Sequence, residues 1–203
     1  MTLNDFDNLI LHKKFISFSF KKNKHCVSRR AFVKTIFDKT YNQSFDFKFK
    51  EYIKFQKGTI NQCDNEAVCI GYNPAKASLS LDVTNKRLID LLWNNFSGYL
   101  LINLYPQVST NKCSCIPDLD ENKNFSEVIV EILKKDKREI IIFWGRSVLI
   151  DENIKDAIEN RIQLNLPLKR TTHNGKFTHP ASNADIKLED VTLDRIRNSF
   201  HIE

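Results

Sequence analysis

Short apolar runs alternate with amphipathic helical patterns along most of this chain, and this alternation constrains the fold more than any other feature. The apolar runs predict strands at 67–70, 99–102 and 139–144, and a further extended pair around 166–178 with a turn at Asn174-Gly175. Helical spacing of apolar residues predicts helices at 83–97, 128–133, 154–162 and 188–200. Strand–helix units of this kind form right-handed crossovers. We therefore expect an α/β protein, a three-layer αβα sandwich with a central, mainly parallel sheet.

Two helix starts can be proposed from the residues that cap helices. Asp82 or Thr84 is placed to cap the helix at 83–97, and Asn124 or Ser126 to cap the next one. These short polar side chains accept hydrogen bonds from the first backbone N–H groups of a helix.

The first 57 residues differ from the rest in charge and in aromatic content. Residues 1–60 hold 13 of the 31 Lys and Arg residues but 5 of the 25 Asp and Glu residues. Period-two alternation predicts strands at 15–20 and 45–50, and Ser28 is expected to begin a short helix at 28–37. We expect a basic N-terminal extension, 1–57, that packs on a main domain, 58–203. Its charge indicates an anionic partner or simply a solvated face.

The remaining composition excludes several classes of protein. No apolar stretch approaches the roughly 18 residues of a membrane span, and the N-terminus lacks the basic-then-apolar order of a signal peptide. The five cysteines do not pair off, which suits a reducing compartment, so a cytoplasmic protein is expected. Cys113 and Cys115 form the only tight pair, and tolerated thiols are favoured over a metal centre.

Polar residues follow the predicted strands at the edge where open parallel sheets bind ligands. Two amides and one imidazole are expected to meet there, those of Asn73, Asn103 and His179. The loops at 71–75, 103–106 and 144–147 contain no acid, which argues against a metal-dependent nuclease or phosphatase. The phosphate-binding and dinucleotide-binding glycine motifs are absent. Amides and an imidazole suit a planar polar group such as the edge of uracil.

In order and position, these segments resemble the motifs of the uracil-DNA glycosylase superfamily. The matching stretches, which together cover about residues 66–183, are Gly71-Tyr72-Asn73-Pro74, Leu100-Leu101-Ile102-Asn103, Ile141-Ile142-Phe143-Trp144-Gly145 and His179-Pro180-x-Ser182. The first is similar to the loop of the mismatch-specific uracil/thymine branch, and the chain also resembles a distant arm of small bacterial proteins. The resemblance implies a glycosylase-like sandwich that hydrolyses the N-glycosidic bond of uracil in DNA and leaves an abasic site.

The resemblance also implies roles for individual residues. His179 donates to O2 of the departing base, Asn73 holds the attacking water, and Asn103 reads the uracil edge. Phosphate contacts are implied for Ser182 and for the backbone near Gly71 and Gly145. Candidates for the aromatic residue that stacks on the base are Tyr72, Tyr105 and Trp144. Further DNA contacts are expected from the basic side chains of Lys21, Lys22, Lys24, Arg29, Arg30 and Arg146.

The implied partners are uracil-containing or mismatched DNA, free uracil as the product, and a protein inhibitor of uracil-DNA glycosylases. No membrane partner is expected. No cofactor or metal is expected either, because water is the nucleophile and the base is the leaving group.

Three positions depart from the superfamily's uracil-specific pattern. Asn73 cannot accept a proton as an Asp can, which predicts slow chemistry. Ala75 replaces a bulky Tyr and opens the pocket to other 5-substituted pyrimidines, and Asn183 replaces the Leu that wedges into DNA.

Other interpretations stay open on the sequence alone. The protein could be a catalytically weak or inactive DNA-binding relative, or an enzyme acting on free nucleosides. Taken singly, Asn73-Pro74 fits an ordinary turn, His179 a loop residue, Asn103 a loop cap and Trp144 a core residue.

Overall fold

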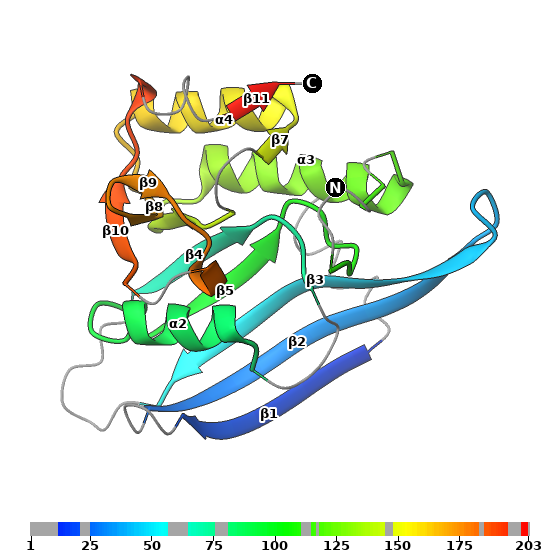
Figure 1. The fold of residues 1–203 in the computed structure, drawn as a ribbon, viewed down its shortest axis with the longest axis horizontal. Coiled ribbons are helices and arrows are strands. Elements are labelled where there is room, and N and C mark those ends of the chain that lie inside the picture. Colours follow the sequence, from blue (N-terminus) through cyan, green and yellow to red (C-terminus); the bar gives the residue numbers. More distant parts are fainter. Residues whose placement is uncertain are drawn as a thin grey trace.

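One mixed sheet organises the computed structural model, which describes residues 12–20, 25–56, 65–75, 81–110, 115–116, 118–144, 148–182, 185–194 and 200–202 (Figure 1). Its strand order is β1-β2-β3-β5-β4-β6-β8-β10. The strands of this path are β1 (His12–Phe20), β2 (His25–Asp38), β3 (Gln43–Phe55), β4 (Glu66–Gly71), β5 (Gly98–Asn103), β6 (Ile140–Ile142), β8 (Leu168–His173) and β10 (Lys187–Asp190). β9 (Lys176–Phe177) pairs with β8, and β7 (Val148–Ile150) pairs with β11 (Phe200–Ile202) in a separate small sheet.

The centre of the sheet is parallel and its flanks are antiparallel. β5, β4, β6 and β8 run in one direction, whereas β3 and β10 run against them. The chain passes from β4 to β5 on one side and then crosses to β6 on the other side of β4. Open α/β sheets bind ligands at such a reversal of strand order, beyond the carboxyl ends of the strands.

Helices cover both faces of this sheet, so the expected three-layer arrangement is confirmed. α2 (Val83–Leu92) packs on the face that carries Ala67 and Cys69 of β4. α3 (Asp120–Lys135) and α4 (Glu152–Gln163) pack on the other face, against Val68 and Ile70. Successive residues of a strand point to opposite faces, so the apolar run of β4 serves both cores. Figure 1 shows α2 well separated from α3 and α4.

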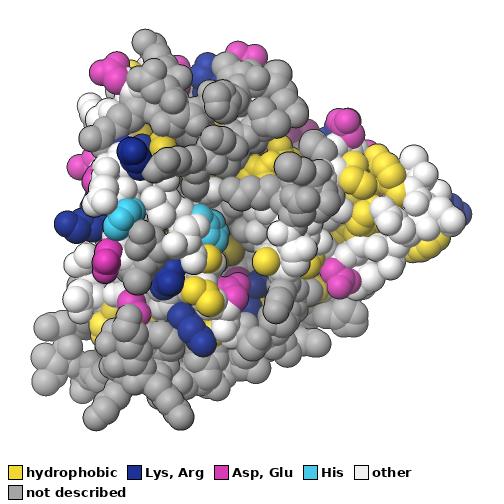
Figure 2. All heavy atoms as spheres, in the orientation of Figure 1, with side chains coloured by type: hydrophobic (Ala, Val, Ile, Leu, Met, Phe, Trp, Pro, Cys, Tyr) yellow, Lys and Arg dark blue, Asp and Glu magenta, His cyan; other side chains and the backbone are white. Residues whose placement is uncertain are grey.

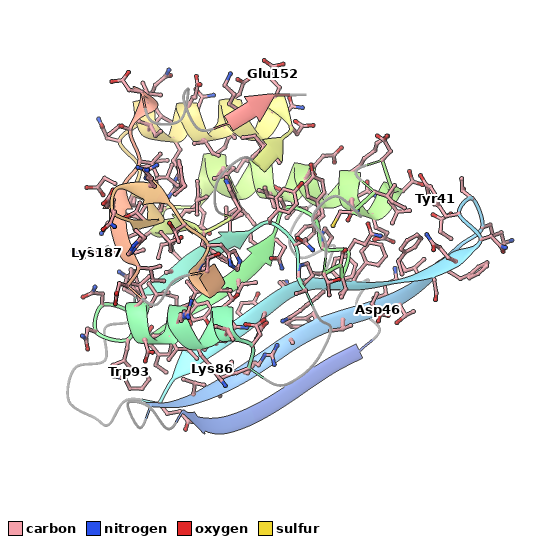
Figure 3. All side chains as sticks on the ribbon, in the orientation of Figure 1. Tyr41, Asp46, Lys86, Trp93, Glu152 and Lys187 are labelled. Carbon is pink, nitrogen blue, oxygen red and sulfur yellow. The ribbon has the colours of Figure 1, made fainter. Side chains whose placement is uncertain are left out.

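The N-terminal strands continue the sheet and do not form an added layer. β3 pairs with β5 along Lys50–Lys54, and β2 and β1 follow in antiparallel register. The hairpin between β2 and β3 projects beyond the helices, with Tyr41 near its tip (Figures 1 and 3). The expected domain boundary after residue 57 lies outside the described residues.

The helix expected at 28–37 is wrong, because this segment is part of β2. Its apolar spacing fits a helix locally, but pairing with β3 over most of its length satisfies its backbone as a strand. Val27, Arg29, Ala31 and Phe32 of β2 are buried.

The helix starts were predicted with mixed success. Asp82 caps α2 as expected, its carboxylate accepting the Asn85 N–H at 2.7 Å. α3 begins several residues before the expected caps, after Leu119, with no side-chain cap, so neither Asn124 nor Ser126 caps it.

The C-terminal part of the chain also differs from expectation. The Asn174-Gly175 turn is confirmed, with φ angles of 50° and 71°. The helix expected at 188–200 is wrong at both ends, since Lys187–Asp190 is strand β10, paired with β8, and Phe200 begins strand β11. Residues 193–194 are helical, and 195–199 lie outside the described residues. Among the described helices, none has the length and apolar character needed to span a membrane.

Candidate functional site

A cavity of about 270 Å³ opens beyond the carboxyl ends of β4, β5 and β6, next to the loop that follows β9. This is smaller than the pockets that hold drug-sized ligands, so it suits a single small ring. Figure 2 shows histidine, basic and acidic side chains close together near the middle of the visible face. The residues that line the cavity are Lys48, Asn73, Pro74, Ala75, Asp82, Thr84, Asn85, Leu101, Asn103, Ser109, Thr110, Phe143, His179 and Ser182.

A larger cavity, of about 780 Å³, lies between α3 and the start of α4. Among its described lining residues, Tyr105 is the only predicted site residue, and acidic side chains such as Asp118, Glu127 and Glu152 outnumber the basic ones. The smaller cavity is the candidate site because the strand-end amides and the imidazole gather there.

Close packing at the end of β4 brings Asn103 and Phe143 to the cavity. Gly71 pairs with Asn103 at the ends of two parallel strands. A Cβ atom at Gly71 would lie 2.6 Å from Asn103 Oδ1 and 2.7 Å from Phe143 Cζ. Only glycine leaves room for both groups. Asn103 is buried at 4% exposure and still lines the cavity, as a group that reads a ligand edge must.

The Asn73 side chain has a fixed orientation. Its Nδ2 donates to the Ser109 carbonyl at 2.7 Å, while Ser109 N–H donates to the Pro74 carbonyl at 2.9 Å. A carbonyl oxygen only accepts, so this bond determines which end of the amide is nitrogen. Asn73 Oδ1 takes no part in the hydrogen bonds among the described residues. Asn73 can therefore hold its turn through Nδ2 and still offer Oδ1 as a hydrogen-bond acceptor to a ligand.

His179 is held by the short helical turn η2 (Pro180–Ser182). The Ala181 N–H donates to His179 Nδ1 at 3.1 Å, and the Ser182 N–H donates to the His179 carbonyl at 2.9 Å. Since Nδ1 accepts, the proton of the neutral ring is on Nε2. The Arg87 guanidinium, from α2, donates to the Pro180 carbonyl and ties this turn to the helix. The imidazole lies 5.8 Å from the Phe143 ring, centroid to centroid.

Among the cavity residues that sequence reasoning missed, three have side chains of clear chemical use to a ligand site, namely Phe143, Asp82 and Lys48. Phe143 is the one Phe, Tyr or Trp among the described lining residues. Asp82, assigned only as a helix cap, supplies the one carboxylate among the described lining residues. Lys48 comes from β3, within the segment treated as an extension. Of these three, only Phe143 could have been found from the sequence, because it lies at the end of a predicted strand.

The structure contradicts the predicted roles of two residues. Trp144 is fully buried on the α3 and α4 side, so it does not stack on a ligand in the cavity. It follows Phe143 in the chain, and neighbouring residues of an extended segment point to opposite faces. Arg29 is 1% exposed and pairs with Glu51, so its side chain does not reach a phosphate on the surface.

The other predicted residues have varied positions. Ser182, Asn73, Asn103 and His179 come together in the cavity. Tyr72 and Tyr105 pack edge to face, 5.1 Å apart, beside the α3-side core and outside the cavity lining. Outside the described residues, or with side chains outside them, are Lys21, Lys22, Lys24, Arg30, Gly145 and Arg146.

The thiols and acids give no metal centre in the described part of the chain. No group of three or more His, Cys, Asp or Glu side chains gathers there. Cys69 and Cys115 are buried, and burial, followed by the nearby Glu139 carboxylate, raises the pKa of the Cys69 thiol. Cys63 and Cys113 lie outside the described residues.

The fold and the site define a class: an α/β sandwich protein with a small polar cavity at the carboxyl edge of its parallel strands. The chain belongs to the DUF1643 family, described as a protein of unknown function, whose model matches residues 56–181. The matched span includes Asn73, Asn103 and His179 and leaves out β1, β2 and β3. No curated protein and no solved structure matches the chain.

Proposed function

We propose that this protein is a DNA glycosylase that hydrolyses the N-glycosidic bond of uracil, and of other 5-substituted pyrimidines, in DNA and leaves an abasic site. One observation carries the proposal. Asn73, Asn103 and His179 are far apart in the sequence and come from two loops and the end of β5, yet they line one cavity. These are the residues to which the glycosylase resemblance assigns water binding, base reading and leaving-group stabilisation.

The cavity offers complementary groups to a flipped-out uracil. The Asn103 amide can donate from Nδ2 to O4 and accept the N3–H at Oδ1. The Phe143 ring provides an apolar surface for the base. The small side chain of Ala75 leaves space for a substituent at C5. Flipping the nucleotide costs a few kcal/mol and is easiest for a mismatched base.

The proposed chemistry is a hydrolysis in which water attacks C1′ of the deoxyribose. The C1′–N1 bond breaks, and its electron pair leaves with the base. His179 donates from Nε2 to O2, where negative charge develops. Asn73 Oδ1 accepts one hydrogen of the water, whose oxygen bonds to C1′. The Asp82 carboxylate, at the cavity wall, stabilises the cationic sugar and takes the proton that the water loses.

The test uses labelled oligonucleotides with a single uracil, single-stranded or opposite G or A. After incubation with the protein, alkali cleaves abasic sites. We expect excision by the wild type and a loss of roughly a hundredfold or more in His179→Ala and Asn103→Ala. His173→Ala is the matched control, since His173 lies on β8, away from the cavity, and it should retain the wild-type rate.

Folded protein that yields no abasic product on any of these substrates would overturn the proposed function. Tight, salt-sensitive DNA binding without excision would instead identify a catalytically inactive DNA-binding relative. The amide of Asn73, in place of a carboxylate, is the observation that favours this second candidate.

A further inference from the structure

A buried polar network lies behind the cavity, and the chemistry proposed above does not use it. Its centre is the Glu51 carboxylate on β3. Arg29 Nε donates to Glu51 Oε1, and Lys48 Nζ forms an ion pair with Oε2 at 2.5 Å. The Asn85 amide donates to Oε1 at 3.4 Å and accepts from the Tyr99 hydroxyl at 2.8 Å. None of these five residues is more than 3% exposed.

Lys48 and Asn85 are the members of this network that line the cavity. Lys48 and Glu51 are three residues apart, a spacing that places side chains on opposite faces of a regular strand. A β-bulge changes this: adjacent residues of β2 pair with Lys48 and Lys50, so Phe49 is an extra residue in β3. The bulge brings Lys48 onto the face of Glu51. Bulges are over-represented beside functional sites, where they re-aim a side chain.

Among the described residues, the network holds more cations than carboxylates. Two cations, Arg29 and Lys48, surround the Glu51 carboxylate. Burial by itself would raise the pKa of Glu51, yet the pKa is lowered by Lys48 and Arg29, so the carboxylate is ionised. Burying each charge costs several kcal/mol, and Arg29 alone would neutralise Glu51. Among the described members of the network the second cation is in excess of the carboxylate, and Lys48 is the cation that lines the cavity.

Two other titratable side chains line the described part of the cavity, those of Asp82 and His179. Asp82 is exposed at the start of α2, and no ion pair joins it to Lys48 in the described structure. His179 is the remaining titratable side chain of the described lining, and its Nδ1 accepts a backbone hydrogen bond.

We propose that Lys48 is an anion-binding residue of the cavity, positioned by Glu51, and that the cavity favours a pyrimidine ring that carries negative charge. The inference rests on the proposed function in one respect: the charge is that of the departing uracil, shared between N1 and O2. Lys48 then stabilises the leaving group together with His179.

A binding experiment tests the anion site without relying on turnover. Calorimetry compares uracil with its 6-carboxylate, orotate, which carries a negative charge beside N1. We expect the wild type to bind orotate roughly tenfold more tightly than uracil, the effect of one hydrogen bond to a charged group. Lys48→Met should lose this preference, and Lys48→Arg should keep it. Equal affinities in the wild type, or a preference that survives in Lys48→Met, would overturn the inference.

Lys54→Met is the matched control. Lys54 lies on the same strand, its side chain is 69% exposed, and its partner is Glu66, so its loss should not change either affinity. Lys48→Met is expected to fold, because Glu51 keeps its bonds to Arg29 and Asn85. Thermal unfolding of each variant verifies this.

A second measurement concerns the leaving group. Excision of uracil is compared with excision of 5-fluorouracil, a more acidic base that needs less stabilisation as an anion. Lys48→Met should slow uracil excision more than 5-fluorouracil excision, whereas a purely structural role would slow both equally.

If Lys48→Met abolishes the orotate preference but the wild type excises nothing, the anion site stands and the proposed function fails. If the wild type excises uracil but Lys48→Met keeps the orotate preference, the proposed function stands and the anion site fails.

Discussion

Gly71 and Asn103 end adjacent parallel strands in contact so close that a Cβ atom at Gly71 would lie 2.6 Å from Asn103 Oδ1. We therefore expect Gly71→Ala to displace the Asn103 amide and the Phe143 ring, at an overpacking cost of about 1–3 kcal/mol. Expressed as free energies, the loss in excision rate should be much larger than the loss in unfolding free energy. Urea unfolding and the oligonucleotide assay measure the two effects.

Gly98→Ala provides the contrast. A Cβ at Gly98 would meet the backbone carbonyl of Ile53, on the neighbouring strand, which cannot move as a side chain can. This variant should lose more stability than Gly71→Ala, because the pairing of β3 with β5 must shift. Equal stability losses, or full excision by Gly71→Ala, would contradict the close packing inferred at the site.

Glu51→Gln should destabilise the protein strongly at neutral pH. The change leaves Arg29 and Lys48 buried without their carboxylate, and breaking such a pair costs roughly 3–5 kcal/mol. The pKa of Glu51 is lowered from its ordinary value of 4.5, so the stabilisation is fully present above that value. It is lost as the pH falls through the lowered pKa. Urea unfolding on both sides of pH 4.5 should show the variant and the wild type converging in acid.

Glu66→Gln is the control for this pH dependence. The Glu66 side chain is 29% exposed, and its partners Lys54 and Arg138 are partly solvated. Exposed pairs contribute about 0–1 kcal/mol. A loss in Glu51→Gln no larger than that in Glu66→Gln would show that the buried network does not stabilise the fold.

Asn73→Asp should not accelerate excision, although the amide at this position suggests that the lack of a general base limits the rate. Asn73 Nδ2 donates to the Ser109 carbonyl at 2.7 Å, and a carboxylate has no hydrogen to offer there. Repulsion between the two oxygens should displace the loop and reduce the rate to that of Asn73→Ala or near it. Single-turnover excision by the three proteins measures this, and a faster Asp variant would show that Asn73 faces the water without holding the loop in place.

Arg87→Ala should loosen the turn that holds His179. The guanidinium donates to the Pro180 carbonyl, and hydrogen bonds from charged groups contribute roughly 1.5–3 kcal/mol. We expect faster hydrogen exchange of the Ala181 and Ser182 amides and slower excision, with partial rescue by Arg87→Lys. Lys86→Ala, the exposed neighbour on α2 (Figure 3), is the control and should change neither. Unchanged exchange in Arg87→Ala would rule out this positioning role.

The sequence by itself determined the alternation of strands and helices in the body of the protein and the strand-end segments that hold Asn73, Asn103 and His179. Apolar periodicity directly encodes which side of a local element is buried, and parallel strands bring their carboxyl ends to one edge. These features need no knowledge of distant partners.

Tertiary structure alone decided the strand at 28–37, the burial of Arg29 and Trp144, and the arrival of Lys48 at the cavity. A segment with ambiguous periodicity becomes a strand when a neighbour pairs with it, as β3 does with β2. A bulge of one residue changes which face every later side chain takes. Both depend on register between strands, which is fixed by the packed sheet and not by the residues of either strand alone.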